Sequence, residues 1–279
     1  RQDDGTLALG GEGETVDWVV DMRRFDQDTL FDRMARAGTL TRAMVEDLAD
    51  RIADFHGKAE VNMEAGGSAG IGMIIKNNDK CFGKLDRQET RRLTRLSLDA
   101  LDGLTGLLDR RRDLDRVRLC HGDLHLRNIC MVDGTPTLFD AIEFNDAFST
   151  IDVLYDLAFV LMDLNHLGLG RLANILFNRY FDNTGEGEEH LDGLRVMALF
   201  LSMRAAIRAH VDISQAESLS DVAQAKRRAG EAADYLHSAI SVMTPPSPRL
   251  IAVGGLSGSG KSRMARELAP HIGSAGAAL

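Results

Sequence analysis

Residues 120–130 bring together side chains that can act in one chemical reaction. The segment reads Cys-His-Gly-Asp-Leu-His-Leu-Arg-Asn-Ile-Cys, so Asp123 precedes Asn128 by five residues, and Asp140 follows shortly after. Phosphoryl transfer from ATP uses such a set: a carboxylate orients the attacking hydroxyl and accepts its proton, while an amide oxygen and a second carboxylate hold Mg²⁺. The segment therefore predicts phosphoryl transfer that depends on ATP and Mg²⁺.

A β-hairpin is expected to bring Asn128 and Asp140 together. Two short apolar runs, residues 129–132 and 137–139, flank the turn sequence Asp-Gly-Thr-Pro at residues 133–136. In a hairpin, the residue that enters the first strand lies beside the residue that leaves the second. We therefore expect Asn128 and Asp140 at one end of the hairpin, with Asp123 in the loop before it.

A transition-metal site is the alternative use of the same segment. His121, Asp123 and His125 are residue types that can bind zinc. That alternative leaves the hairpin beyond them without a role. Cys120 and Cys130 are expected to be buried without chemical function, because a free cysteine packs as a small hydrophobic residue.

A second motif lies near the end of the chain. Residues 250–253 form an aliphatic run that predicts a strand, residues 255–262 match the Walker A pattern, and residues 263–268 predict a helix. In such a loop, backbone N–H groups surround phosphates, a lysine reaches the terminal phosphates, and a serine coordinates Mg²⁺. A glycine–serine linker is the alternative, but Lys-Ser at the helix start argues against it. The predicted nucleotide-binding residues are Gly255, Gly258, Gly260, Lys261 and Ser262, and Ser262 is also a predicted magnesium ligand.

Helices are expected to hold both motifs in place. Apolar residues recur at helical spacing over residues 26–55 and 87–112, and helical sequence resumes from residue 151 to about 243. Residues 66–72 predict a loop, and residues 6–9 and 15–22 predict short strands around a glycine-rich turn. Three prolines within residues 244–249 predict a linker.

The sequence from His121 to Asp123, followed by Asn128 and Asp140, resembles the signature of aminoglycoside phosphotransferases and related small-molecule kinases. The resemblance covers about residues 5–243. It implies that Asp123 is the catalytic base, that Asn128 and Asp140 hold magnesium, and that His121 braces the catalytic loop. The acceptor would be a hydroxyl group of a small molecule.

Two further positions carry the same resemblance. Tyr155-Asp156-Leu157-Ala158 resembles the helix start whose aspartate ties down the catalytic loop, which implies that role for Asp156. Glu143 is a candidate for the surroundings of the metal. The family's small lobe also carries a lysine that holds the ATP phosphates, yet the first lysine of this chain is Lys58.

The fold class implied is α+β and mostly helical, a kinase-like large lobe with a remnant of the β small lobe and the first strand-loop-helix of a P-loop α/β domain. We expect a small-lobe remnant and hinge at residues 1–25, the helical lobe at 26–243, the linker at 244–249 and a truncated P-loop domain at 250–279. This order resembles bacterial bifunctional proteins that join an aminoglycoside phosphotransferase to an ATP-binding domain.

Both ends of the chain suggest a fragment. The first residue is Arg1, and residues 273–279 end within an expected element. Because the small-lobe lysine is missing and the P-loop domain is incomplete, we expect the chain on its own to be inactive. Two alternatives to a catalytic phosphotransferase domain remain open. In one, the kinase-fold domain binds or regulates without turnover. In the other, the P-loop domain carries the activity and the first domain only recruits the substrate.

The composition of the chain argues against some classes of binding partner. The formal charge is −9 over 279 residues, which argues against nucleic acid and anionic membranes as partners, since both attract basic surfaces. Three cysteines without paired spacing and the lack of a long apolar run favour a cytoplasmic protein. An acidic loop can attract a cationic acceptor, although a solvated surface loop is the simpler interpretation. Its residues are Asp182, Glu186, Glu188, Glu189 and Asp192.

Overall fold

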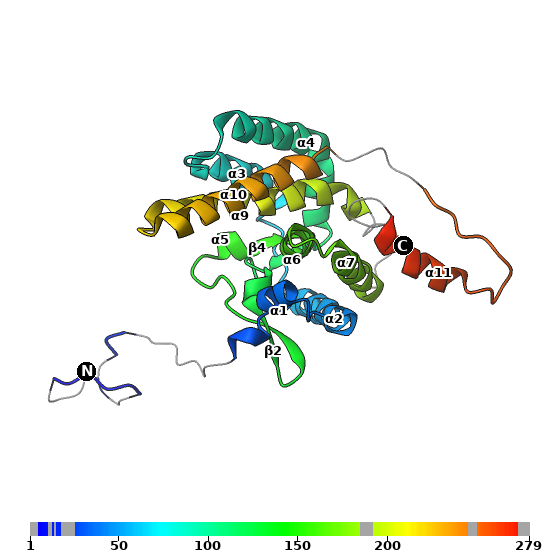
Figure 1. The fold of residues 1–279 in the computed structure, drawn as a ribbon, viewed down its shortest axis with the longest axis horizontal. Helices are drawn as coiled ribbons and strands as arrows, with labels where there is room; N and C mark the ends of the chain where they lie inside the picture. The colour runs from blue at the N-terminus through cyan, green and yellow to red at the C-terminus, as the bar shows by residue number, and fades with distance from the viewer. Residues whose placement is uncertain are drawn as a thin grey trace.

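Helix α6 (Val153–His166) lies at the centre of the molecule (Figure 1). The computed structural model describes residues 5–10, 13, 15–17, 26–184, 192–244 and 250–272. Every residue of α6 from Val153 to Leu164 is buried. A helix that is covered on all sides in this way needs neighbours on every face.

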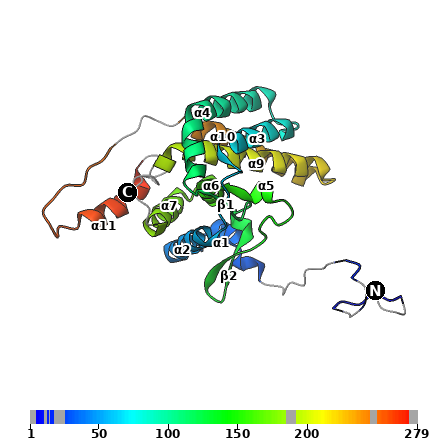
Figure 2. The ribbon, with the colours of Figure 1, turned by 180° about the vertical axis from the view of Figure 1, so that it is seen from behind.

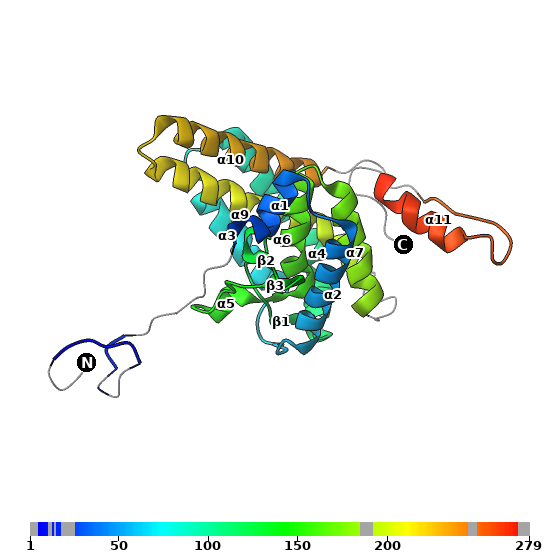
Figure 3. The same ribbon diagram turned by 60° about the horizontal axis from the view of Figure 1, so that its bottom comes forward.

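Further helices surround α6 in packed pairs. Helix α2 (Arg42–Lys58) packs against α7 (Gly170–Thr184), and α3 (Gly67–Cys81) packs against α4 (Arg87–Asp113). Helix α9 (Met197–Ser218) packs against both α6 and α10 (Val222–Val242). Figure 3 shows α9 and α10 side by side, and Figure 2 shows α3 and α4 beside them. The short elements are η1 (Gln27–Thr29), α1 (Phe31–Ala37), α5 (Asp146–Ser149) and η3 (Asp192–Val196).

Two small antiparallel sheets carry the segment that holds the candidate site. Strand β1 (Val117–Leu119) pairs with β4 (Thr150–Asp152), and β2 (Ile129–Val132) pairs with β3 (Thr135–Leu138). The predicted hairpin is confirmed, but its loop has only two residues. Asp133 and Gly134 have φ values of 48° and 75°, as a type I′ turn requires, so β3 begins at Thr135.

The mostly helical α+β fold is confirmed, with differences at three predicted elements. Residues 66–72 were expected to form a loop, but α3 begins at Gly67. Its first turn is held from outside, because Ser68 N donates to Asp109 Oδ1 of α4 at 2.9 Å, and its apolar residues Ile71 and Ile75 are buried. Packing therefore outweighs the low helix propensity of the glycines.

The strands predicted at residues 6–9 and 250–253 are not formed in the described part of the chain. A strand is stable only within a sheet, and the two sheets of the described residues include neither run. Of residues 15–22 only 15–17 are described, and they are exposed. Linker residues 245–249 and residues 273–279 lie outside the described residues.

The C-terminal segment lies against the helical body. Helix α11 (Lys261–Leu268) continues into η4 (Ala269–His271), which contacts α7 and buries Ala269. An ion pair of 3.2 Å joins Glu267 to Arg42 at the start of α2. Among all described helices, none combines the length and apolarity needed to cross a membrane.

A buried ion pair joins α4 to the start of α6. Arg111 donates to both carboxylate oxygens of Asp152, at 2.7 and 2.8 Å, and both side chains are almost fully buried. Asp152 also accepts from Leu154 N at 2.8 Å and so caps α6. Burial opposes the charge on Arg111, but the field and hydrogen bonds of Asp152 leave the pKa of its guanidinium raised.

Removing one partner of this pair should leave an uncompensated buried charge. We predict that Arg111→Met lowers the free energy of unfolding by about 3–5 kcal/mol. The control is Arg110→Met on the same helix, because Arg110 forms an exposed pair with Asp192 and should contribute at most about 1 kcal/mol. Equilibrium denaturation measures both, and equal losses for the two variants would contradict this account.

Candidate active site

The candidate site is built on the loop of residues 121–128, called here the Asp123 loop. It connects β1 to β2 and ends in η2 (Leu126–Asn128). Gly122 has a φ of 82°, and a Cβ at this position would lie 3.0 Å from Ile142 Cδ1 and 3.2 Å from Phe148 O. Both the backbone conformation and the lack of space therefore require glycine. The Gly122 carbonyl accepts a hydrogen bond of 2.9 Å from Arg204 Nη1.

Asp123 and Asn128 are in direct contact. Asn128 Nδ2 donates to Asp123 Oδ2 at 3.1 Å and to the Asp123 carbonyl at 3.0 Å, so one amide group closes the loop. His125 Nε2 lies 3.3 Å from the same carboxylate oxygen. The Asp123 side chain remains 39% exposed, so it is both held in place and accessible.

The surroundings of Asp123 favour its charged form. Burial alone would raise the pKa of this carboxyl group. The hydrogen bond and charge of His125, the charge of Arg204 and the hydrogen bond from Asn128 outweigh that effect and lower the pKa. Asp123 is therefore ionised at neutral pH.

Asp140 lies at the hairpin end that also holds Asn128. The preceding residue, Phe139, donates its N–H to the Asn128 carbonyl at 3.1 Å. Asp140 itself is exposed and has a φ of 61°, an uncommon value for a residue other than glycine. No described residue donates a hydrogen bond to its carboxylate or forms an ion pair with it. Its oxygens are thus available to a ligand.

His121 bridges the Asp123 loop and the segment after β3. Its Nε2 atom bonds to the Phe139 carbonyl at 2.9 Å, and its own carbonyl accepts from Ile142 N at 3.0 Å. These two bonds fix the positions on either side of Asp140. The geometry therefore suits a brace, as the family resemblance implies.

Asp156 holds the beginning of the loop from beneath. Its carboxylate, fully buried on α6, accepts from His121 N at 3.1 Å and from Gly122 N at 3.0 Å. His56 Nε2 donates to it at 3.1 Å, and Arg204 Nη2 lies 3.6 Å away. Burial alone would raise the pKa of Asp156, but His56 and Arg204 outweigh it and lower the pKa.

A second carboxylate on α6 holds the other end of the loop. Asp163 Oδ2 accepts from Leu126 N at 3.2 Å, and Tyr235 of α10 donates to Oδ1 at 3.3 Å. The His125 ring packs edge-on against Phe159, which lies between the two aspartates on α6. One buried helix therefore supports the loop at both ends.

A match to a known family agrees with this geometry. Residues 25–195 match the family described as "Phosphotransferase enzyme family", and the match covers more than half of the chain. The chain belongs to the phosphotransferase enzyme family. The matched range contains the Asp123 loop, the β2–β3 hairpin and Asp156, while α9, α10 and α11 lie beyond it.

Relatives of this family member occur in mycobacteria. "Uncharacterized protein Rv2004c" of Mycobacterium tuberculosis (strain ATCC 25618 / H37Rv) and "Uncharacterized protein Mb2027c" of Mycobacterium bovis are each 27% identical to it over 273 residues. The alignments cover 95% of this chain and 52% of each relative. The chain thus spans about half the length of these relatives.

Solved structures of two kinases are similar at low identity. A glucosamine kinase has 13% identity and a TM-score of 0.48, with 76% of this chain and 56% of that chain covered. A choline kinase from Cryptosporidium parvum Iowa II has 11% identity and a TM-score of 0.48, with 77% and 69% covered.

The geometry does not favour a transition-metal site in the Asp123 loop. The His121 ring bonds to a carbonyl, and both His125 ring nitrogens are engaged, one by Asp123 and the other by Arg127 N at 3.2 Å. Within the described ranges, one group of three side chains has ligand atoms close enough for a metal, namely His56, Cys120 and Asp156.

That group is better explained as an internal brace. His56 uses one ring nitrogen for Asp156 and the other for Tyr180 at 2.9 Å. Burial raises the pKa of the Cys120 thiol well above its ordinary value, which keeps it protonated and a poor metal ligand. Cys120 and Cys130 are both buried free cysteines, as expected.

A hydrogen bond crosses the predicted phosphate-binding loop near the C-terminus. The Lys261 ammonium donates to the Leu256 carbonyl at 2.7 Å, across the loop. Gly260 has a φ of 80° and is the N-cap of α11, so the helix begins at Lys261, two residues before the helix predicted at residues 263–268. Ser262 follows in the first turn and is exposed.

The other two glycines of this loop lie before Gly260. Gly258 has a φ of 78°, which favours glycine. At Gly255 a Cβ would lie 2.7 Å from Ser259 Oγ, so a larger residue would press on the loop. The residues predicted to bind nucleotide therefore form one local turn. This turn lies outside residues 25–195, which match the family.

The acidic residues proposed to attract a cation are only partly described. Asp192 pairs with Arg110 and Asp182 lies 4.0 Å from Arg266, so both already have cationic neighbours. Glu186, Glu188 and Glu189 lie outside the described residues. Glu143 is exposed.

Sequence reasoning missed Arg204 and Asp163. Arg204 is buried on α9, bonds to the carbonyls of Tyr155 and Gly122 at 2.9 Å, and stacks over the Tyr155 ring at 3.9 Å. A signal was present, because arginine within the apolar sequence of residues 197–206 predicts a buried anionic or carbonyl partner. The sequence does not identify the partners of Arg204, because they lie on segments that are distant in the chain and meet it only in the packed fold.

Neutralising Asp156 should weaken both the fold and the loop. We predict that Asp156→Asn lowers the free energy of unfolding by about 3 kcal/mol or more at neutral pH, because the buried Arg204 loses its counter-charge and His56 loses a charged hydrogen-bond partner. The exposed control Asp54→Asn removes only a surface pair with Lys58 and should change stability by less than about 1 kcal/mol.

The same comparison has a defined pH dependence. The pKa of Asp156 is lowered by folding, so its contribution is complete at neutral pH and is lost as the pH falls through that lowered value, below about pH 4. The stability difference between wild type and Asp156→Asn should therefore shrink in that acidic range. A difference that is absent at neutral pH, measured by chemical denaturation, would contradict the role given to Asp156.

Proposed function

We propose that the full-length protein containing this chain transfers the terminal phosphoryl group of ATP to a hydroxyl of a small molecule. One observation carries the proposal. The ionised carboxylate of Asp123 is held by the Asn128 amide beside a hairpin end where the Asp140 carboxylate is exposed and has no ion-pair partner among the described residues. Membership of the phosphotransferase enzyme family supports the reaction class.

In this proposal Asp123 acts on the acceptor hydroxyl. Its lowered pKa makes it a weak base, which suits a reaction with little bond formation to the nucleophile in the transition state. Asp123 would orient the hydroxyl by accepting its hydrogen bond and would take the proton as transfer proceeds. His125 and Asn128 would keep the carboxylate in that orientation.

Asn128 and Asp140 suit a magnesium ion. Asn128 Nδ2 is used by Asp123, but its Oδ1 atom accepts no hydrogen bond from the described residues, and the Asp140 carboxylate is exposed. Amide and carboxylate oxygens are the hard ligands that Mg²⁺ prefers. When bound, Mg²⁺ neutralises charge on the transferred phosphates. His121 would act by fixing the backbone on both sides of Asp140.

A second nucleotide site is proposed at residues 255–262. The turn at Gly258 and Gly260, and the start of α11 at Lys261, support phosphate binding by backbone N–H groups and the lysine. Lys261 would exchange its bond to the Leu256 carbonyl for one to a phosphate. Residues 26–243 would then form the phosphotransferase unit and residues 250–279 the beginning of a P-loop unit.

Two substitutions at the candidate site, Asp123→Asn and Asp140→Ala, should act on different steps. In full-length protein, Asp123→Asn should lower kcat by about 10²- to 10⁴-fold while ATP affinity stays nearly constant. Asp140→Ala should weaken Mg·ATP binding as well as turnover. Steady-state kinetics and calorimetry measure these effects, and the exposed turn variant Asp133→Asn is the control. Near-normal turnover in Asp123→Asn would reject the proposal and favour a non-catalytic binding module.

The P-loop site has its own test. Lys261→Ala should remove one ATP-binding event from full-length protein and leave Asp123-dependent turnover in place, because the two sites share no residue. Lys226→Ala, which removes an exposed lysine on α10, is the control for lost charge. If Lys261→Ala alone abolishes phosphoryl transfer, the reaction belongs to the P-loop unit.

A further inference from the structure

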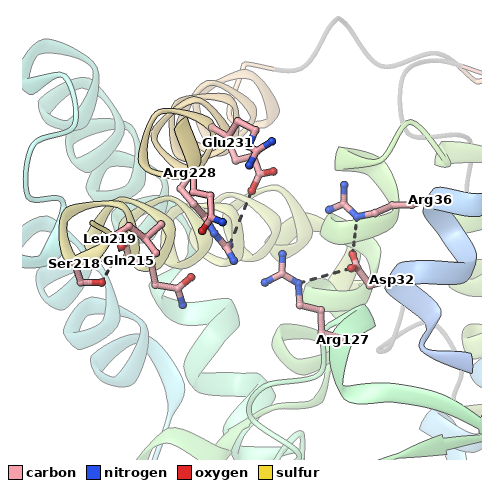
Figure 4. Close-up of a pocket in the computed structure, with 10 residues that line it drawn as sticks. Asp32, Arg36, Arg127, Gln215, Ser218, Leu219, Arg228 and Glu231 are labelled. Carbon is pink, nitrogen blue, oxygen red and sulfur yellow. Dashed lines mark hydrogen bonds and ion pairs between the residues drawn. The ribbon is translucent and has the colours of Figure 1, made fainter. Parts of the chain in front are cut away.

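A cavity of about 510 Å³ adjoins the Asp123 loop and is lined by four separate elements. Helix α1 contributes Asp32 and Arg36, η2 contributes Arg127, and the facing ends of α9 and α10 contribute polar side chains that include Arg228 and Glu231. Figure 4 shows the side chains of α1 and η2 opposite those of α9 and α10 across this space.

Positive charge dominates the cavity, in contrast to the whole chain with its formal charge of −9. Four arginines line it, Arg36, Arg127, Arg227 and Arg228, against the carboxylates of Asp32 and Glu231. A guanidinium group has five N–H donors and cannot lose its charge in a protein. The cavity thus offers more cationic donor groups than its own carboxylates can satisfy.

Among the described residues, the ion pairs leave N–H donors of three of these four arginines available. Arg36 and Arg127 share the single carboxylate of Asp32, at 3.3 and 3.9 Å. Arg227 is exposed and has no ion-pair partner in the part of the chain that the structure describes. Only one of the four, Arg228, is firmly held, by the buried carboxylate of Asp212 at 2.8 Å.

The position of Arg127 links this cavity to the proposed reaction. Arg127 directly precedes Asn128, whose side chain holds the Asp123 carboxylate. Neither Asp140 nor any residue of the β2–β3 hairpin lines the cavity, so it is separate from the groups proposed to hold the nucleotide through magnesium. A molecule in the cavity would approach Asp123 from the side of α1, α9 and α10.

We infer that this cavity binds an anionic group, a phosphate or a carboxylate, of the acceptor whose hydroxyl faces Asp123. The inference rests on the proposed function and assigns its substrate class. Guanidinium groups match the planar or tetrahedral oxygens of such anions with paired hydrogen bonds. An acceptor that carries an ammonium group would meet net repulsion from the same surface, because its charge has the sign of the arginines.

Calorimetry on the full-length protein tests this inference with matched ligands. Glucose 6-phosphate, glycerol 3-phosphate and gluconate are compared with glucose, glycerol and glucosamine, in the presence of Mg²⁺ and a saturating non-hydrolysable ATP analogue. At least one anion should bind at least about tenfold more tightly than its neutral parent, as expected for a hydrogen-bonded charge. Its affinity should fall with added salt.

Charge reversal at Arg227 locates the binding. Arg227→Glu should weaken binding of that anion by about 10- to 100-fold. The control is Lys226→Glu, the same change at the neighbouring exposed position outside the cavity, and it should alter the affinity by less than about threefold. Circular dichroism checks that both variants keep the wild-type helical content.

Several outcomes overturn the inference. One is equal or tighter binding of the neutral and amine-bearing ligands. Another is an equal effect of the two charge reversals on anion binding. A third is loss of anion binding when the ATP analogue saturates, which would assign the arginines to the nucleotide. Failure of the proposed function looks different: the anion binds and depends on Arg227, but no acceptor is phosphorylated and Asp123→Asn changes nothing.

Discussion

The structure depends on one buried carboxylate, that of Asp156. Three segments distant in the sequence meet at it: the end of α2 through His56, the Asp123 loop through two backbone N–H groups, and α9 through Arg204. A buried charge is tolerated only when it is paired and hydrogen-bonded on most sides. The position of the loop is therefore fixed by the requirement to satisfy this carboxylate.

The same requirement explains why the partly exposed carboxylate of the loop has a fixed orientation. Gly122 bends the chain where no Cβ fits, so its N–H reaches Asp156 and its carbonyl reaches Arg204. The following residue, Asp123, then emerges with a partly exposed carboxylate whose orientation is set by Asn128. A reactive carboxylate keeps its position when the backbone before it is anchored and its own oxygens are hydrogen-bonded, and Asp123 meets both conditions.

Much of this arrangement was predictable because it is encoded locally. The turn sequence at residues 133–136 predicted the hairpin, and with it a common end for Asn128 and Asp140, although the loop proved two residues shorter than expected. The repeating leucines of residues 87–112 specified α4. Asp156 was predicted only through the resemblance of residues 155–158 to a motif of the family.

Other features depend on contacts between distant segments and could not be read locally. Helix α3 forms despite its glycines because α4 packs against it and caps its first turn. The arginines of the cavity come from α1, η2 and α10, and each of them alone resembles an ordinary surface residue. Their common location depends on how the α9–α10 pair is placed against α1, which no single segment specifies.

The support of the Asp123 loop by a single helix limits the evolution of the loop's length. Asp156 and Asp163 are seven residues apart on α6, two turns or about 10 Å along its axis, and they hold Gly122 and Leu126 respectively. The chain between these anchors must span a distance set by helix pitch. Substitutions can alter the side chains of this span, whereas an inserted or deleted residue would detach one anchor. Variation among related loops should therefore occur by replacement and not by insertion or deletion.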